Sequence, residues 1–137
     1  MTSEDTTKPV RFHMPDERPS ITKKFVIKSN DEEIDGYVTV GLYKTEDGIQ
    51  KIGEIFIMTA KEGDSTRGLL NTLSIAVSVG LQHGVPMQKY IDKFKCLSFP
   101  PSGMTQDKPP LTFAQSVVDY VFRWIEHRFF RCPDEEE

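Results

Sequence analysis

The chain has 137 residues, 37% hydrophobic and 28% charged, a size and composition that predict one globular domain. Its net charge of −4 and its scattered basic residues exclude a strong electrostatic attraction to nucleic acid. The polar N-terminus lacks the features of a secretory signal, and no stretch is typical of a membrane span. We therefore expect a cytoplasmic protein with reduced cysteines and no membrane partner.

Residues 1–19 have no periodicity and include three prolines, which predicts a flexible N-terminal arm. Residues 21–29 alternate weakly between apolar and polar side chains, and we interpret them as a first strand. An acidic turn over residues 30–36 should follow, most simply as a solvated tip.

Residues 37–43 form the clearest predicted strand. Val38, Val40 and Leu42 share one side of it, so they should face a layer of helices. The Asp-Gly pair that follows predicts a hairpin into a partner strand over residues 51–59. Strands joined by such short turns form an antiparallel meander.

From Arg67 to His83 the apolar period changes to about 3.6 residues, which predicts a helix. Apolar side chains occupy most of its sides, so we expect a long central helix, buried on most sides and packed across the sheet. Gly84 suits the position after its end, and Pro86 suits the start of a shorter helix that ends at Phe94.

Residues 96–111 contain four prolines and predict an irregular loop, of a length that is commonly functional or disordered. The last helix should begin near Thr112, because its hydroxyl and Gln115 fit a capping box. The pattern as a whole predicts an α+β fold: an antiparallel sheet of three or more strands, a long central helix and two further helices packed on one face. This module should span residues 20–131, before an acidic tail over 132–137.

Recognisable catalytic and metal-binding motifs are absent from the sequence. His83 is interpreted first as a helix-end cap and Cys96 as a small core residue, with catalysis by either as the weaker alternative. Ser65, Thr66 and Arg67 are interpreted first as helix-capping residues. The alternative is an anion or nucleotide site formed by the free backbone N–H groups there.

Ten segments carry a resemblance to a known family. They are Arg18-Pro19-Ser20, residues 36–41, 53–57, 68–70, 76–78, 80–82, 84–86, 90–94 and 116–123, and the loop Phe99-Pro100-Pro101-Ser102-Gly103-Met104, similar to F-E-P-S-G-M. Over about residues 15–130 the chain resembles the C-terminal TSCPD-type module of adenosylcobalamin-dependent (class II) ribonucleotide reductases. Pro100 stands where the family has a glutamate.

The resemblance implies that an upstream barrel, which binds nucleotide and cobalamin and holds the catalytic cysteines, is not part of this sequence. Many members also end in a cysteine pair that relays electrons, whereas Cys132 stands alone here. We therefore expect no catalytic residue and no metal site in this chain, and no cofactor bound by it alone. Adenosylcobalamin would belong to the partner.

The leading hypothesis is a free-standing accessory or small subunit that docks on the catalytic chain of a class II reductase and supports deoxyribonucleotide synthesis in trans. The alternative is a stand-alone regulatory module that binds a nucleotide or another protein through Ser65–Arg67 and the proline-rich loop. A third, weaker hypothesis is an enzyme that uses His83 or Cys96. Self-association is compatible with each.

The proline-rich loop is the predicted docking element, because prolines hold it extended and reduce the entropy lost on binding. It also displays apolar side chains for which a solvated loop has no structural use. The candidate docking residues are Phe99, Pro101, Ser102, Gly103 and Met104. The alternative is that Phe99 and Met104 pack back onto the last helix, near Phe113 and Val117.

Overall fold

The computed structural model describes residues 10–30, 32–59 and 64–130 of the chain. Its elements in chain order are β1 (Ser20–Lys28), β2 (Glu33–Lys44), β3 (Gln50–Thr59), α2 (Asp64–Gln82), α3 (Met87–Phe94), β4 (Gly103–Thr105), β5 (Phe113–Ala114), α4 (Val117–Ile125) and a π-helical turn, η1 (Glu126–Phe130). The acidic tail and Cys132 lie outside the described residues.

Five strands in the described part of the chain form one antiparallel sheet, in the order β3-β2-β1-β4-β5. The predicted α+β fold is thereby confirmed. Two local predictions were wrong. The acidic turn is shorter than residues 30–36, because β2 begins at Glu33 and buries Ile34 in the core. The proline-rich loop is not wholly irregular, because β4 pairs with Ile27 and Lys28 of β1.

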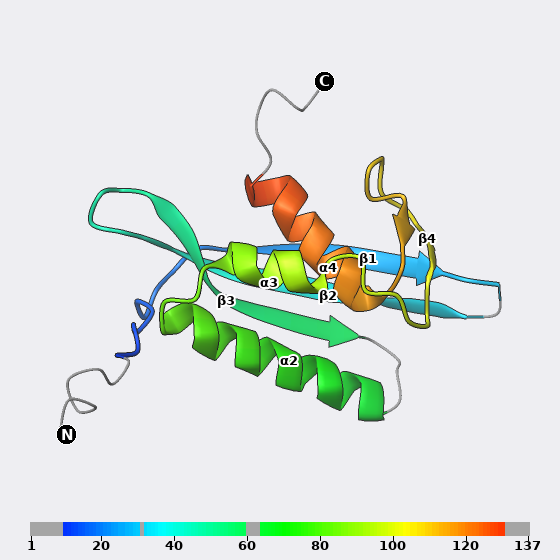
Figure 1. Cartoon of the computed structure of the whole chain (residues 1–137), viewed down its shortest axis with the longest axis horizontal. Coiled ribbons are helices and arrows are strands. Elements are labelled where there is room, and N and C mark those ends of the chain that lie inside the picture. Colours follow the sequence, from blue (N-terminus) through cyan, green and yellow to red (C-terminus); the bar gives the residue numbers. More distant parts are fainter. Residues whose placement is uncertain (1–9, 31, 60–63, 131–137) are drawn as a thin grey trace.

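One face of the sheet, the inner face, is covered by α3 and α4 (Figure 1). Val38, Val40 and Leu42 are buried in this layer, as predicted. They belong to the same core as Ile91 of α3 and the apolar residues of α4. The opposite side of the sheet is the outer face. Among the described helices, none is long and apolar enough to cross a membrane.

The helix at the centre of the core is α4. Eight of its nine residues are buried, and the ring of Tyr120 lies 5.3 Å from the ring of Phe25 on β1. Its predicted start was wrong: Phe113 lies in β5, and the N-cap is Ser116, whose hydroxyl accepts the N–H of Asp119 at 2.9 Å. The N-cap is therefore four residues later than the predicted Thr112.

The long helix α2 lies beside the edge strand β3 rather than across the sheet (Figure 1). The expectation that it is buried on most sides was wrong, because Leu69, Ile75 and Val79 are exposed. Its buried side carries Leu70, Val77 and Leu81, and several other apolar side chains of the helix face solvent.

Hydrogen bonds explain why α2 occupies the edge. Three side chains four residues apart on α2 bond to backbone groups of β3 at 2.8–3.1 Å: Ser74 to Ile57, Ser78 to Ile55 and Gln82 to Gly53. Four residues of a helix rise about 6.0 Å and two residues of a strand about 6.6 Å. The side chains on α2 and the backbone groups on β3 therefore have matching spacings. The helix thus satisfies the edge that the sheet would otherwise leave unpaired.

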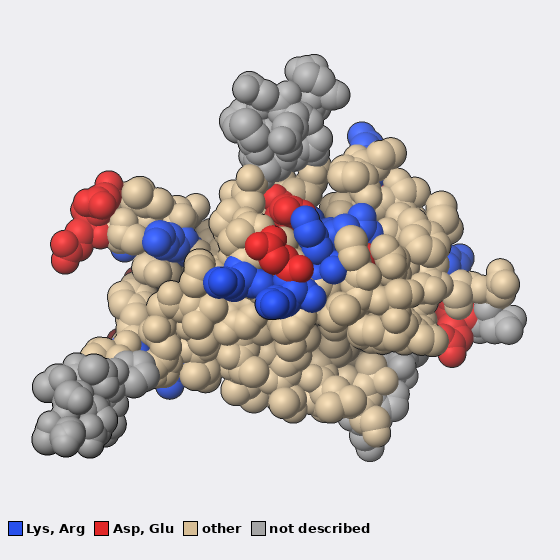
Figure 2. Space-filling model, viewed as in Figure 1, with Lys and Arg blue, Asp and Glu red and all other residues tan. Residues whose placement is uncertain are grey.

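From Gly68 to Gln82, α2 carries no charged side chain. Figure 2, in the same view as Figure 1, shows charged side chains gathered over α3 and η1, where Lys95 meets Glu126 at 3.0 Å. No Lys, Arg, Asp or Glu occurs from Gly68 to Gln88. The exposed side of α2 after its first turn is therefore neutral as well as partly apolar.

The predicted arm over residues 1–19 is described from Val10 onward, and this part lies against the outer face near the start of β3. Arg18 pairs with Glu54 at 2.6 Å, and the ring of Phe12 lies 4.5 Å from that of Tyr43. The backbone N–H of Phe12 also donates to the Gln82 carbonyl at 2.6 Å. These contacts anchor residues 10–19 to the domain; residues 1–9 lie outside the described part.

Candidate functional site

The predicted docking loop leaves α3, forms β4 and returns through β5 to α4. Phe99 and Met104 are 43% and 54% exposed, and Pro101 and Ser102 are half-buried. Met104 does lie beside Phe113, as the alternative expected, but as its partner across β4 and β5 and not packed on the last helix. The function of Phe99 and Met104 in docking remains a prediction.

Gly103 has a structural task in this loop. It is buried in β4, and a Cβ atom there would collide with the backbone carbonyl of Lys28 on β1. Only glycine allows the two strands to approach this closely. We therefore assign Gly103 to sheet formation rather than to partner contact.

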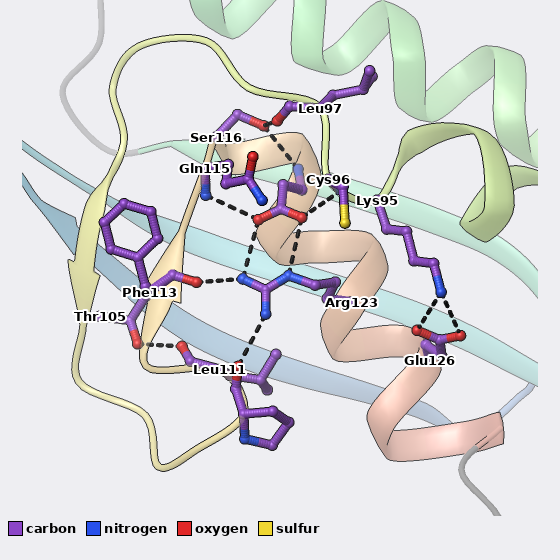
Figure 3. Close-up of polar contacts among 12 residues, drawn as sticks. Lys95, Cys96, Leu97, Thr105, Leu111, Phe113, Gln115, Ser116, Arg123 and Glu126 are labelled. Carbon is purple, nitrogen blue, oxygen red and sulfur yellow. Dashed lines mark hydrogen bonds and ion pairs between the residues drawn. The ribbon is translucent and has the colours of Figure 1, made fainter.

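A single buried carboxylate closes the loop (Figure 3). Asp119 of α4 is fully buried and accepts the backbone N–H of Cys96 at 2.6 Å and that of Gln115 at 2.9 Å. These two residues lie near the two ends of the loop. The negative charge is neutralised by Arg123, whose Nε lies 3.0 Å from the Asp119 carboxylate.

Arg123 and Ser116 extend this polar cluster (Figure 3). The Arg123 guanidinium also donates to the carbonyls of Pro110 and Phe113, and the Ser116 hydroxyl donates to the Leu97 carbonyl at 2.7 Å. Backbone carbonyls that would otherwise lack partners are satisfied in this way. The loop is therefore held by α4 at several points along its length.

The far turn of the loop is fixed by Asp107. Its carboxylate accepts the hydroxyl of Tyr120 and lies 2.9 Å from Lys23 Nζ. Burial raises the pKa of Tyr120 well above its ordinary value, and the hydrogen bond to Asp107 raises it further. Tyr120 is therefore a protonated donor throughout the physiological range, and the loop displays Phe99 and Met104 from a pre-ordered frame.

Ser65, Thr66 and Arg67 lie within the first turn of α2, which begins at Asp64. Ser65 and Arg67 are exposed. In the sheet, β2 and β1 separate β3, which α2 flanks, from β4. The strand order therefore places α2 and the proline-rich loop beside different strands of the sheet, and their joint function stays a prediction.

His83 and Cys96 do not form a catalytic pair with another residue in the described contacts. The ring Nδ1 of His83 lies 2.9 Å from the Val79 carbonyl, one turn back at the exposed end of α2. Cys96 is free and exposed, with φ at +70°, so the prediction of a core cysteine was wrong. It ends α3 in a left-handed conformation that glycine or asparagine usually adopts.

Binding of a metal ion or of cobalamin depends on which side chains and cavities the described residues form. No group of three or more His, Cys, Asp or Glu side chains in the described ranges could hold a metal ion. A cavity of about 600 Å³ lies between the β2–β3 hairpin, the α2–α3 turn and η1, and no histidine lines it. Such a volume suits a drug-sized molecule, so the described residues do not fit a group as large as cobalamin.

One feature of the surface was missed by sequence reasoning. Tyr37, Phe56 and Met58 point from β2 and β3 to the outer face and are about half exposed or more. The signal was present in the sequence, because alternate residues of both strands are apolar on each side. The alternation in β2 predicts a packing partner only for the side that carries Val38.

Comparison with known proteins gives a consistent result. The family model described as the TSCPD domain matches residues 6–129. The chain is 44% identical over 116 residues to a vitamin B12-dependent ribonucleotide reductase of Streptomyces coelicolor. It is 42% identical over 127 and 113 residues to proteins of the same name from Rhodopirellula baltica and Bradyrhizobium diazoefficiens.

The coverage of these matches is unequal. They include 85%, 93% and 82% of this chain but only 11%, 11% and 8% of the three relatives. This chain therefore spans about a tenth of the length of the curated relatives that it matches. No match to a solved structure was found.

Proposed function

The chain belongs to the TSCPD domain family, and from that premise we propose that it acts as an accessory subunit of a vitamin B12-dependent ribonucleotide reductase. In this proposal it docks on a separate catalytic chain and supports deoxyribonucleotide synthesis in trans. The site of action is then the cytoplasm.

The observation that carries the proposal is that the matches to proteins named as reductases include 85% and 93% of this chain. Relatives named as reductases match nearly the whole of this chain, yet about nine-tenths of their length lies outside the match. In the proposal, the part of the reductase that performs the reaction is supplied by the partner.

In this proposal cobalamin is bound by the partner, because the partner supplies the part of the reductase that performs the reaction. Cobalamin supplies the radical chemistry of such a reductase, and the names of the relatives include vitamin B12. This chain would contribute a contact surface and a pre-ordered loop. Phe99 and Met104 on the clamped loop are the contact residues proposed from sequence, with Pro101 and Ser102 beside them.

A regulatory module that binds a nucleotide or another protein remains the second hypothesis. It required Ser65–Arg67 and the proline-rich loop to form one surface, and the strand order places them beside different strands of the sheet. The geometry therefore favours the accessory subunit.

A binding measurement tests the proposal. The purified chain is titrated into the vitamin B12-dependent reductase chain of the same organism, from which any segment matching this module has been removed. We expect a complex with a dissociation constant of about 1 µM or tighter. The absence of a complex at about 100 µM, roughly a hundredfold weaker, would refute the accessory function.

A further inference from the structure

The outer face of the sheet exposes large apolar side chains where an open antiparallel sheet usually carries polar ones. Five of them are between 47% and 65% exposed: Tyr37, Phe56, Met58, Met104 and Phe113. They come from β2, β3, β4 and β5. The apolar side chains therefore form two groups, one on β2 and β3 and one on β4 and β5, with the outward Lys24 and Lys28 of β1 between them.

The register of β2 and β3 places Tyr37, Phe56 and Met58 on the same side of the sheet. Tyr37 pairs with Met58, and the next outward position of β3 is Phe56. Paired residues point to the same side of a sheet, and neighbours along a strand point to opposite sides. Since Val38 and its partner Ile57 are buried in the inner core, Tyr37, Phe56 and Met58 point outward.

The register of β4 gives the same result on the far half of the sheet. Met104 pairs with Lys28 of β1 and with Phe113 of β5. Ile27, the neighbour of Lys28, is fully buried on the inner face, so Lys28 and both its row partners point outward. Met104, a docking residue proposed from sequence, is thus one end of a larger surface.

The N-terminal arm covers only one end of this face. Arg18 reaches Glu54, and Met14 packs where a side chain on Gly53 would lie. The five apolar side chains remain exposed with the arm in place. The arm shows that the outer face accepts apolar contacts, but it leaves most of the face open.

We propose that the outer face is the surface through which this chain packs against the larger reductase chain, an inference that rests on the proposed function. Four strand spacings separate β3 from β5, about 19 Å in all, which suits a protein surface better than a small ligand. In the matched relatives about nine-tenths of the chain lies outside the module, so a large body is available to it. The arm also packs at one end of this face, through Arg18 and Phe12.

The partner surface is expected to be mainly apolar. Lys28 on β1 already has Glu33 4.0 Å away, which neutralises part of the local charge. Lys24 lies beside Tyr37 in the register of β1 and β2 and is exposed. An acidic group on the partner opposite Lys24 would complete the contact, with a small effect on affinity and a larger one on association rate.

The experiment uses the full chain and the same reductase chain as above. Phe56→Ser with Met58→Ser should weaken binding at least tenfold, about 1.4 kcal/mol, while the melting temperature stays unchanged. Leu69→Ser is the matched control, because Leu69 is 71% exposed on α2. Leu69 lies on α2, beside the edge strand, and not on the strands that carry the five outward side chains.

The outcomes separate the two proposals. If the wild-type chain binds and the double variant binds equally well, the outer face is not the docking surface, although the accessory function stands. If the wild-type chain does not bind, the accessory function fails and this inference fails with it. If the double variant does not fold, Lys24→Glu and Tyr37→Thr replace it, with the same criterion. A wild-type dimer that the double variant dissolves would identify a second copy as the occupant and overturn the proposal.

Discussion

Asp119 is the residue on which closure of the proline-rich loop depends. It is fully buried, and its two oxygens serve Cys96, Gln115 and Arg123 together. An isolated buried charge is costly, so each member of this cluster needs the others. The main effect of the cluster is therefore to fix the position of the loop, and the ion pair between Asp119 and Arg123 is only one part of it.

Asp119→Ala should lower the free energy of unfolding by about 3 kcal/mol, because it leaves Arg123 without its carboxylate and two backbone N–H groups without an acceptor. Urea denaturation measures this. Glu126→Gln is the control: its pair with Lys95 is a third exposed on each side, so the loss should be below about 1 kcal/mol. Equal effects of the two substitutions would contradict the assigned role of Asp119.

Tyr120 gives the fold a dependence on alkaline pH. Its pKa is raised in the folded state by burial first and by Asp107 second. Above about pH 10 the unfolded chain loses the phenol proton while the folded chain keeps it, so stability falls by about 1.4 kcal/mol per pH unit from this residue. Below about pH 10, the contribution of Tyr120 to the free energy of unfolding does not change with pH.

Tyr120→Phe should remove this slope. Urea denaturation of both proteins between pH 9 and pH 11 measures the difference. Parallel stability curves for the wild type and Tyr120→Phe would show that the phenol ionises as readily in the folded state as in the unfolded chain.

At the scale of elements, α2 is an edge-covering helix. Its serines reproduce the spacing of the backbone groups on β3, so the helix does for this edge what a further strand would do. Leu73 is only half-buried there, so Leu73→Ala should cost less than the 2–5 kcal/mol typical of core leucines.

Ser74→Ala with Ser78→Ala should cost about 1–3 kcal/mol for each hydroxyl removed, because the N–H groups of Ile57 and Ile55 lose their acceptors. The uncovered edge should also favour pairing between molecules, which light scattering detects. Thr72→Ala is the control, since Thr72 is exposed and bonds only to Gly68 of its own helix. A double variant as stable and as monodisperse as Thr72→Ala would contradict the edge-covering role.

The sequence predicts the main elements because they rest on local periodicity. The alternation of Val38, Val40 and Leu42, and the glycine after α2, each specify a local conformation that the structure adopts. Gly84 has φ at +99°, as a helix-terminating glycine requires. Short-range rules of this kind do not depend on the rest of the fold.

Positions set by long-range contacts were not predictable in the same way. An apolar helix can be buried by several neighbours or expose one side to a partner, and the pattern of α2 does not distinguish them. The serine spacing at 74 and 78 was the available clue. Asp119 and the outer face were missed because their significance depends on which strands become neighbours.

At the scale of the whole molecule, the domain has two unlike sides. The inner side is complete, with α3 and α4 over a continuous core, whereas the outer side exposes apolar groups across four strands. Exposed apolar groups of this kind on the outer side mark a surface for interaction with another molecule. A partner surface accounts for these exposed groups and agrees with the proposed accessory function.

The central claim is that this chain supports a reductase made of a separate catalytic chain. The most direct measurement is deoxynucleotide formation by that catalytic chain, lacking the module, with adenosylcobalamin, a nucleotide substrate and a dithiol. We expect no product from this chain alone, and a rate for the catalytic chain that rises and saturates as this chain is added. A rate that does not change at any concentration of added chain, or turnover by the isolated chain after contaminating reductase is excluded, would contradict the account.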